Sequence, residues 1–290
     1  MTERIGYYPG CSLHTSAKEY DLATRAVLQA VGMDCTEIPD WNCCGASSAH
    51  TRDHSLSYAL PLRNLIQAQG CGQELVVPCA ACYSLLRTTE GFLAGQSEPA
   101  KQLQGQVEKI LGKDYNRTVK VTHPLDLLTR REVLARIKER QVRSLSGLRV
   151  APYYGCFLVR PELAAFDNPE QPQKMDVLLR ELGAEVVRWS YKTECCGGGL
   201  GITQGTSARP LVDRLVLEAK NAGAQALVTA CPLCQANLEG RASNPIPVFY
   251  FTELVGLALN LPNSQKWLKS HLVDVSPVLT RLEGVISGGR

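Results

Sequence analysis

Ten of the twelve cysteines in this chain recur in one pattern, and thiolates serve as metal ligands and redox groups. A single cysteine precedes a Cys-Cys-Gly run, and a C-x-x-C pair follows it. In both halves 33 residues separate the glycine of the run from that pair. The members are Cys11, Cys43, Cys44, Cys79 and Cys82, and then Cys156, Cys195, Cys196, Cys231 and Cys234. The repetition predicts two metal or redox sites.

The number of thiols in each half bears on the kind of metal. A structural zinc ion takes four ligands, and so does a cubane iron–sulfur cluster. Each half offers five thiols, two of them on neighbouring residues whose Cα atoms lie about 3.8 Å apart. Five thiolates favour an open multi-iron assembly in which one sulfur bridges irons. Zinc, or a purely structural cluster, in one half is the alternative. No histidine follows either C-x-x-C pair, which excludes c-type haem.

The segments around these cysteines repeat as well, and they predict the fold. Apolar runs favour strands at 4–8, 35–39, 74–78 and 118–122, and again at 148–154, 184–190, 225–230 and 246–251. Helical patterns lie between them, as at 17–31 and 54–69, and a charged helical connection spans 129–147. Strands that alternate with helices indicate parallel sheets. We therefore expect an α/β fold of two pseudo-repeated Rossmann-like halves, residues 1–146 and 147–290.

Each group of cysteines follows the carboxyl end of an expected strand. Ligands bind at this edge of open parallel sheets, so the five thiols of a half are expected to converge there. The C-x-x-C pair opens a helix, whose free N–H groups favour thiolates. Gly45 and Gly197 follow the doublets, where the chain must turn sharply or approach a cluster closely.

Composition excludes several other classes of protein. The 290 residues are 44% hydrophobic and 20% charged with a net charge of +3, which gives no electrostatic reason to expect a nucleic-acid partner. The first residues lack the apolar core of a signal peptide, and no apolar run is long enough for a membrane span. We expect a cytoplasmic protein whose cysteines are not paired as structural disulfides.

The doubled pattern resembles the CCG-domain proteins, above all the B subunit of heterodisulfide reductase. The resemblance runs from "YYPGCSL" (7–13) to "VFYFTELVGLAL" (248–259) and covers essentially the whole chain. It implies two noncubane 4Fe–4S clusters that cleave or form a disulfide between them. It also implies two partners, an iron–sulfur C-type subunit and a flavin-containing A-type subunit. The first cluster would be held by Cys11, Cys43, Cys44, Cys79 and Cys82, and the second by Cys156, Cys195, Cys196, Cys231 and Cys234.

A second class of function stays open beside this catalytic one. CCG proteins also occur in quinone-linked and sulfur-oxidising complexes, where this chain would be a non-catalytic subunit for electron transfer or docking. His14 and His123 are the histidines best placed to supply protons. We expect Cys35 and Cys71 to be packing residues, and the basic run 130–143 to be a solvated helix face.

Overall fold

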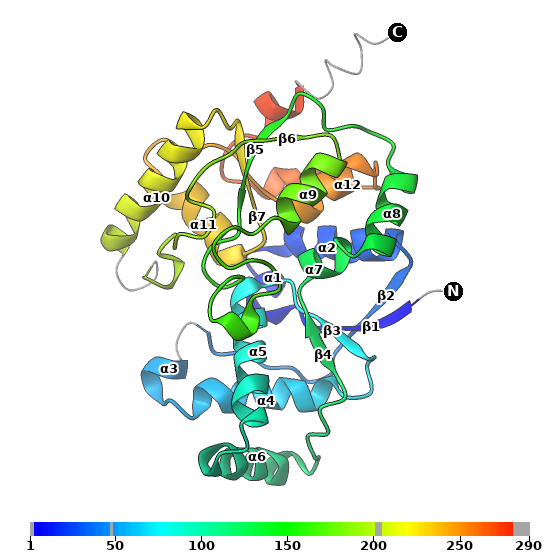
Figure 1. Ribbon diagram of the computed structural model, residues 1–290, viewed down its shortest axis with the longest axis vertical. Helices are drawn as coiled ribbons and strands as arrows, with labels where there is room; N and C mark the ends of the chain where they lie inside the picture. Colours follow the sequence, from blue (N-terminus) through cyan, green and yellow to red (C-terminus); the bar gives the residue numbers. More distant parts are fainter. Residues whose placement is uncertain (1–2, 47–48, 201–204, 281–290) are drawn as a thin grey trace.

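Two four-stranded parallel sheets organise the molecule (Figure 1). The structure is a computed structural model and describes residues 3–46, 49–200 and 205–280. The strand order is β2-β1-β3-β4 in the first sheet and β6-β5-β7-β8 in the second, so the halves share one topology. The expected α/β fold of two Rossmann-like halves is confirmed. The division between residues 146 and 147 stays a prediction.

The strands follow one another in the same way in both halves. The strands are β1 Glu3–Tyr7, β2 Met33–Glu37, β3 Glu74–Val76, β4 Lys120–Thr122, β5 Arg149–Tyr153, β6 Glu185–Val186, β7 Ala226–Thr229 and β8 Val248–Tyr250. The first helices are α1 Gly10–His14, α2 Lys18–Ala30, α3 Ala49–Arg52, α4 Leu56–Ala68, α5 Ala80–Ala94, α6 Glu98–Leu111, α7 Pro124–Leu128 and α8 Arg131–Arg140. The later ones are α9 Lys174–Glu181, α10 Gly205–Asn221, α11 Pro232–Arg241, α12 Phe251–Ala258 and α13 Ser264–Trp267. Helix α6, between α5 and β4, has no counterpart between α11 and β8. Short 3-10 turns are η1 Glu162–Ala164, η2 Gly198–Leu200 and η3 Leu268–Ser270.

Each expected strand segment contains a strand, but β6 is much shorter than the expected 184–190. The reason lies in the neighbouring strand β5. Its Pro152 has no N–H group, so it cannot donate to β6. The carbonyl of Pro152 is taken by the indole N–H of Trp189, at 2.9 Å, instead of by a backbone N–H of β6. The ladder therefore ends after Val187, which donates to Val150.

Helix α2 belongs to the first half but packs against α12 of the second half. In Figure 1 it lies between the first sheet and the helices α9 and α12. The ring of Tyr20 on α2 stacks on Tyr250, with centroids 4.1 Å apart and planes 4° from parallel. Thr24 and Thr252 meet nearby with their hydroxyl oxygens 3.5 Å apart. The two halves are thus joined through a shared core.

A buried charged group stabilises the second half. His271 lies between Glu239 of α11 and Glu253 of α12, with N···O distances of 2.8 and 3.2 Å. Burial alone lowers the pKa of this imidazole, but the hydrogen bonds to the two carboxylates outweigh it and raise the pKa to about 10. His271 is therefore charged at neutral pH and neutralises part of a buried acidic pair.

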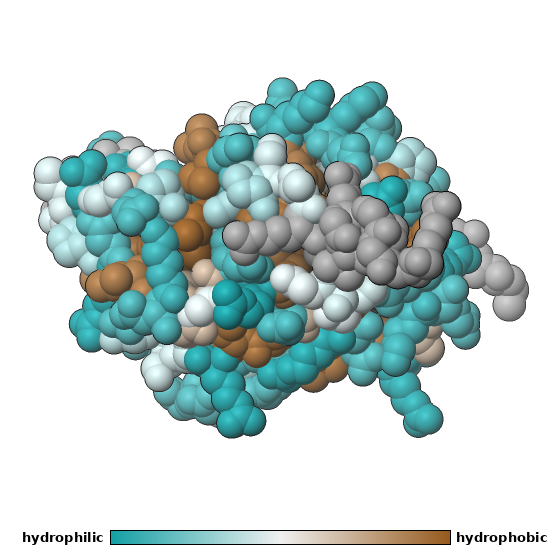
Figure 2. All heavy atoms as spheres, turned by 90° about the horizontal axis from the view of Figure 1, so that it is seen from above, coloured by the Kyte–Doolittle hydropathy of each residue, from teal (hydrophilic) through white to brown (hydrophobic). Residues whose placement is uncertain are grey.

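The outer surface carries mostly polar side chains. The face shown in Figure 2 is largely hydrophilic, and apolar residues show through between the polar ones. Most of the basic run 130–143 lies on α8, which buries Val133 and Ile137 and leaves most of its charged residues exposed, as expected for a solvated helix face. None of the described helices is long and apolar enough to cross a bilayer.

Candidate metal centre

The cysteines of each half lie in three segments that follow strands at one edge of its sheet. The single cysteine follows the first strand, the doublet follows the second, and the C-x-x-C pair follows the third. Cys79 and Cys231 are the residues immediately before α5 and α11, so each C-x-x-C pair opens a helix as predicted. The parallel topology thus delivers thiols from separate strands to one place.

In the first half the thiols form a continuous row. The Sγ atoms of Cys11 and Cys43 lie 3.6 Å apart, and those of Cys44 and Cys82 lie 3.0 Å apart. Cys43 and Cys44 are chain neighbours whose side chains interact, and Cys82 interacts with Cys79 across the first turn of α5. The structure therefore brings together all five thiols that the sequence selected in this half.

The second half repeats the arrangement. The Sγ atoms of Cys156 and Cys195 lie 3.9 Å apart, and those of Cys196 and Cys234 lie 3.5 Å apart. Cys234 interacts with Cys231 at the start of α11. In both halves the single cysteine therefore meets the first member of the doublet. The second member meets the last cysteine of the C-x-x-C pair.

A tyrosine three residues before the single cysteine positions each doublet. The hydroxyl of Tyr8 donates to the carbonyl of Asn42 at 2.8 Å, and that of Tyr153 donates to the carbonyl of Glu194 at 2.7 Å. Asn42 and Glu194 are the residues directly before the doublets. Sequence reasoning missed this role. Aligning the halves on their single cysteines would have placed the two tyrosines in register.

The glycine after each doublet lets the chain turn back toward the thiols. Gly45 and Gly197 have φ angles of +83° and +72°, a region that L side chains rarely adopt. Their N–H groups donate to Sγ of Cys43 at 3.5 Å and of Cys195 at 3.3 Å. The expected sharp turn is present in both halves, and it adds a backbone donor that favours a thiolate.

A second pair of glycines leaves room for sulfur. Gly10 and Gly155 directly precede the single cysteines and have φ angles of +70° and +66°. A Cβ atom built on Gly10 would lie 3.0 Å from Sγ of Cys82, and one on Gly155 would lie 3.2 Å from Sγ of Cys234. The absence of a side chain at Gly10 therefore leaves room for the thiol of Cys82, and its absence at Gly155 leaves room for that of Cys234.

The crowded thiols hold one another in different protonation states. The contact with Cys11 lowers the pKa of Cys43 to about 2, and the contact with Cys156 lowers that of Cys195 to about 6. The same contacts raise the pKa of Cys11 and of Cys156 well above the usual range. Interaction with Cys82 lowers the pKa of Cys79, to which backbone N–H groups at the start of α5 also donate. Each site thus contains thiolates already suited to bind a metal.

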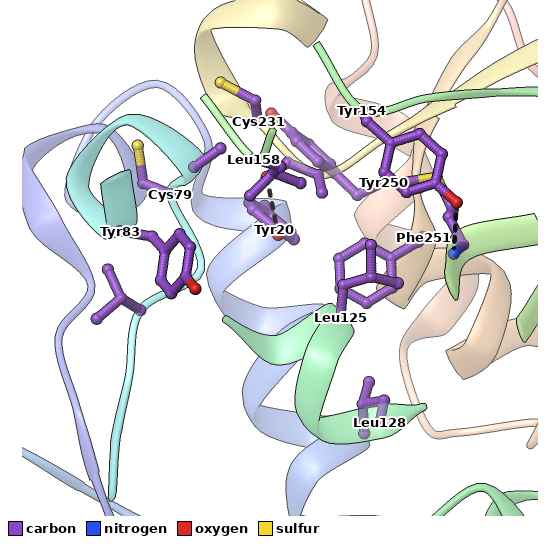
Figure 3. Close-up of a cluster of buried hydrophobic side chains, with 14 of the residues drawn as sticks. Tyr20, Cys79, Tyr83, Leu125, Leu128, Tyr154, Leu158, Cys231, Tyr250 and Phe251 are labelled. Atoms are coloured by element: carbon purple, nitrogen blue, oxygen red, sulfur yellow. Dashed lines mark hydrogen bonds between the residues drawn. The ribbon is translucent and has the colours of Figure 1, made fainter. Parts of the chain in front are cut away.

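The two sites lie on either side of Tyr20, as Figure 3 shows with Cys79 and Cys231 near this ring. Its hydroxyl lies 3.0 Å from the carbonyl of Pro78 and 3.3 Å from that of Ala230. These are the residues directly before the two C-x-x-C pairs, so one hydroxyl bonds to the segments that lead into both sites. Nothing in the spacing of the cysteines pointed to Tyr20, because it lies on a helix away from them in sequence.

The halves also exchange contacts around the sites. Helix α1, which carries Cys11, packs against α11 of the second half. Conversely, η1, which lies shortly after Cys156, packs against α5 of the first half. In both directions the region of a single cysteine meets the helix that the other half's C-x-x-C pair opens.

The histidines differ in their access to solvent. His123 is fully buried, and burial lowers its pKa to about 4. Its Nε2 lies 2.9 Å from the carbonyl of Pro78, and its Nδ1 accepts from the N–H of Leu125. These bonds hold the ring against Pro78, and its lowered pKa keeps it uncharged at neutral pH. His14 is half-exposed and lies 3.4 Å from Glu37.

Other residues near the thiols or elsewhere in the core have structural roles. Cys71 is buried, with Sγ 3.9 Å from the carbonyl of Gln67, and Cys35 is partly buried on β2. Trp41 donates to Glu37, and Lys192 forms a buried ion pair with Asp176. None of these contacts involves one of the ten patterned thiols.

The spacing of the thiols is compatible with metal binding. Two sulfurs bound to one tetrahedral metal at about 2.3 Å each lie about 3.8 Å apart. Three of the four sulfur pairs are separated by 3.5–3.9 Å, and the fourth by 3.0 Å. Among the described residues, no three His, Cys, Asp or Glu side chains are arranged to enclose a single metal ion. Thiolates are the ligands that iron–sulfur clusters use, so the residues present fit such a group.

Comparison with known proteins agrees with this geometry. The cysteine-rich CCG domain matches residues 5–87 and 150–239. The chain is 28% identical over 289 residues to the 8-methylmenaquinol:fumarate reductase membrane anchor subunit of Wolinella succinogenes, covering 95% of this chain and 99% of that protein. It is 26% identical over 300 residues to the B subunit of the ferredoxin/F420H2-dependent CoB-CoM heterodisulfide reductase of Methanosarcina acetivorans, covering 99% of both.

A solved structure has the same fold. It is a hypothetical protein from Helicobacter pylori, with a TM-score of 0.72 and 11% identity. The match covers 92% of this chain but only 51% of that one. At this identity the similarity concerns the fold alone.

Proposed function

This chain belongs to the family of the cysteine-rich CCG domain and is homologous to B subunits of heterodisulfide reductase, and on that premise we propose that it is the catalytic subunit of a complex of this kind. It would cleave or form a disulfide, or a related sulfur bond, between two iron–sulfur sites. Electrons would pass through an iron–sulfur C-type subunit and a flavin-containing A-type subunit.

The placement of two five-thiol sites on either side of Tyr20 carries this proposal. Reduction of a disulfide takes two electrons and two protons and yields two thiols. When bound, the two clusters would supply electrons. Two sites in one chain, held at a fixed spacing, suit a substrate with two sulfur atoms.

The residues of the chain have defined tasks in this proposal. The ten cysteines hold the two groups, while Tyr8 and Tyr153 fix the position of the doublets. Tyr20 ties the two C-x-x-C segments together. His14, on the same short helix as Cys11, is exposed to solvent, so it is suited to pass protons to the product thiols.

Anaerobic purification followed by iron and sulfide analysis tests the proposal. We expect iron and sulfide in both halves, and an EPR signal that changes when a disulfide or thiol substrate is added. Cys195→Ser and Cys231→Ser should abolish turnover and leave the chain folded. Cys35→Ser, outside the pattern, is the matched control and should keep full activity. Zinc in both halves, or normal turnover in Cys195→Ser, would refute the proposal.

A second candidate function is electron transfer or docking within a quinol-linked complex, with zinc in one site as a variant of it. The relative from Wolinella succinogenes favours this function, since it is a subunit of a menaquinol:fumarate reductase. The same EPR experiment separates the two. Clusters that take up electrons but do not respond to any disulfide would support the second function and count against the first.

A further inference from the structure

A cavity of about 410 Å³ lies next to both sites, between α4, α5 and the segment after Cys156. Its lining includes Gly45, which follows the first doublet, and Ala81, which lies inside the first C-x-x-C pair. From the other half it includes Phe157, the residue after Cys156. An occupant would therefore touch segments that carry cysteines of both sites.

The described residues that line this cavity carry no charge. It is formed by apolar side chains such as Leu85, by the ring of Tyr58, and by three small hydroxyl residues. Each of these hydroxyls already donates to a backbone carbonyl: Ser57 to His54, Ser84 to Arg160, and Thr88 to Ser84. A charged group placed here would lose its water without gaining a partner, which is costly.

The second cavity near the cysteines is of a different kind. It has a volume of about 330 Å³ and is lined by Cys195, Glu194 and Arg214, among others. Arg214 also donates to the hydroxyl of Tyr191 at 2.7 Å. Although the halves repeat one another around the thiols, the hollows beside them differ in polarity. A charged ligand has a place beside the second site but not in the cavity at Gly45.

We infer that the cavity lined by Gly45, Leu85 and Phe157 binds an uncharged, apolar small molecule. Its volume lies within the range of about 300–1,000 Å³ that is typical of small-molecule sites, and its mostly apolar wall is equally typical. Because the wall joins segments of both sites, the bound molecule lies where it can exchange electrons or carry the apolar part of a substrate. This inference goes beyond the proposed function and does not require it.

Binding of two matched fluorescent probes to the purified full chain tests this inference. N-phenyl-1-naphthylamine is uncharged, and 1-anilinonaphthalene-8-sulfonate is its sulfonated counterpart. We expect the uncharged probe to bind with one-to-one stoichiometry and at least tenfold more tightly than the sulfonate. Leu85→Glu places a charge in the wall, and Thr88→Trp fills the space. Both residues are only half-buried on α5, so both variants should fold and weaken the binding at least tenfold.

Leu22→Glu is the control, because Leu22 is 55% exposed on α2 and does not line the cavity. It should bind the uncharged probe like the parent chain. Equal affinity for the two probes, or binding that survives both Leu85→Glu and Thr88→Trp, would overturn the inference, and so would the absence of binding. Iron content measured on the same samples separates this result from a failure of the metal sites themselves.

Discussion

The glycines before the single cysteines allow a prediction that separates backbone strain from damage to a metal site. Gly10→Ala and Gly155→Ala each place a methyl group in a left-handed backbone conformation, which costs about 1–2 kcal/mol. In addition, the new Cβ atom would lie 3.0 Å from Sγ of Cys82 or 3.2 Å from Sγ of Cys234. Optimal contact distances are about 3.5–4.0 Å. The sulfur must therefore move by several tenths of an ångström.

Gly112→Ala is the matched control. Gly112 directly follows α6 and has a φ of +62°, so Gly112→Ala has the same cost in backbone conformation. The new Cβ atom, however, meets no neighbouring group within 4 Å. We expect all three variants to lower the free energy of unfolding of the metal-free chain by about 1–2 kcal/mol in urea titrations. Only Gly10→Ala and Gly155→Ala should then lose iron, each from its own half, after anaerobic reconstitution.

Iron and sulfide analysis together with EPR reads out this difference. Gly10→Ala should retain the signal of the second site and lose that of the first, and Gly155→Ala should do the reverse. Full iron content with unaltered spectra in both variants would refute the reasoning, because it would mean that Cys82 and Cys234 are not held where the site needs them. Equal iron loss in Gly112→Ala would trace the defect to stability alone.

Three further predictions follow from contacts around the sites and in the core. Tyr20→Phe should destabilise the chain by about 1–3 kcal/mol and shift the EPR signals or midpoint potentials of both sites, whereas a change in stability alone would contradict its bridging role. Tyr153→Phe should lower iron content in the second half only, and Tyr8→Phe in the first half only; loss from both halves in either variant would argue against separate supports. The charged His271 stabilises the fold fully below the unfolded pKa of about 6.5, and this contribution should be lost as the pH rises toward its folded pKa of about 10. His271→Gln should cost about 3–5 kcal/mol at neutral pH and flatten this dependence in urea titrations; an unchanged alkaline slope would show that another group is responsible.

The repeat in the sequence was enough to predict both sheets and the convergence of the thiols. Spacing determines which strand each cysteine follows, and a parallel sheet brings the ends of its strands to one edge. The short β6 was not foreseen, because its end depends on Pro152 in a neighbouring strand and on the bond from Trp189. Local patterns in the sequence do not report such pairing between strands.

The supports of the sites were harder to foresee than the thiols. Tyr8 and Tyr153 lie in register before the single cysteines, so the repeat contained their signal. No sequence pattern indicated the role of Tyr20, because its two acceptors lie 58 and 210 residues further along the chain. The proton-supply role considered for His123 depended on exposure, and only the structure shows that this ring is fully enclosed.

The exchange of contacts between the halves has a consequence for the origin of the chain. The region of the single cysteine in each half lies against the helix opened by the other half's C-x-x-C pair, through α1 with α11 and η1 with α5. One half alone would therefore carry both complementary surfaces, and two identical copies could satisfy each other across a twofold axis. This arrangement is what the duplication and fusion of a gene for a symmetric homodimer would leave behind.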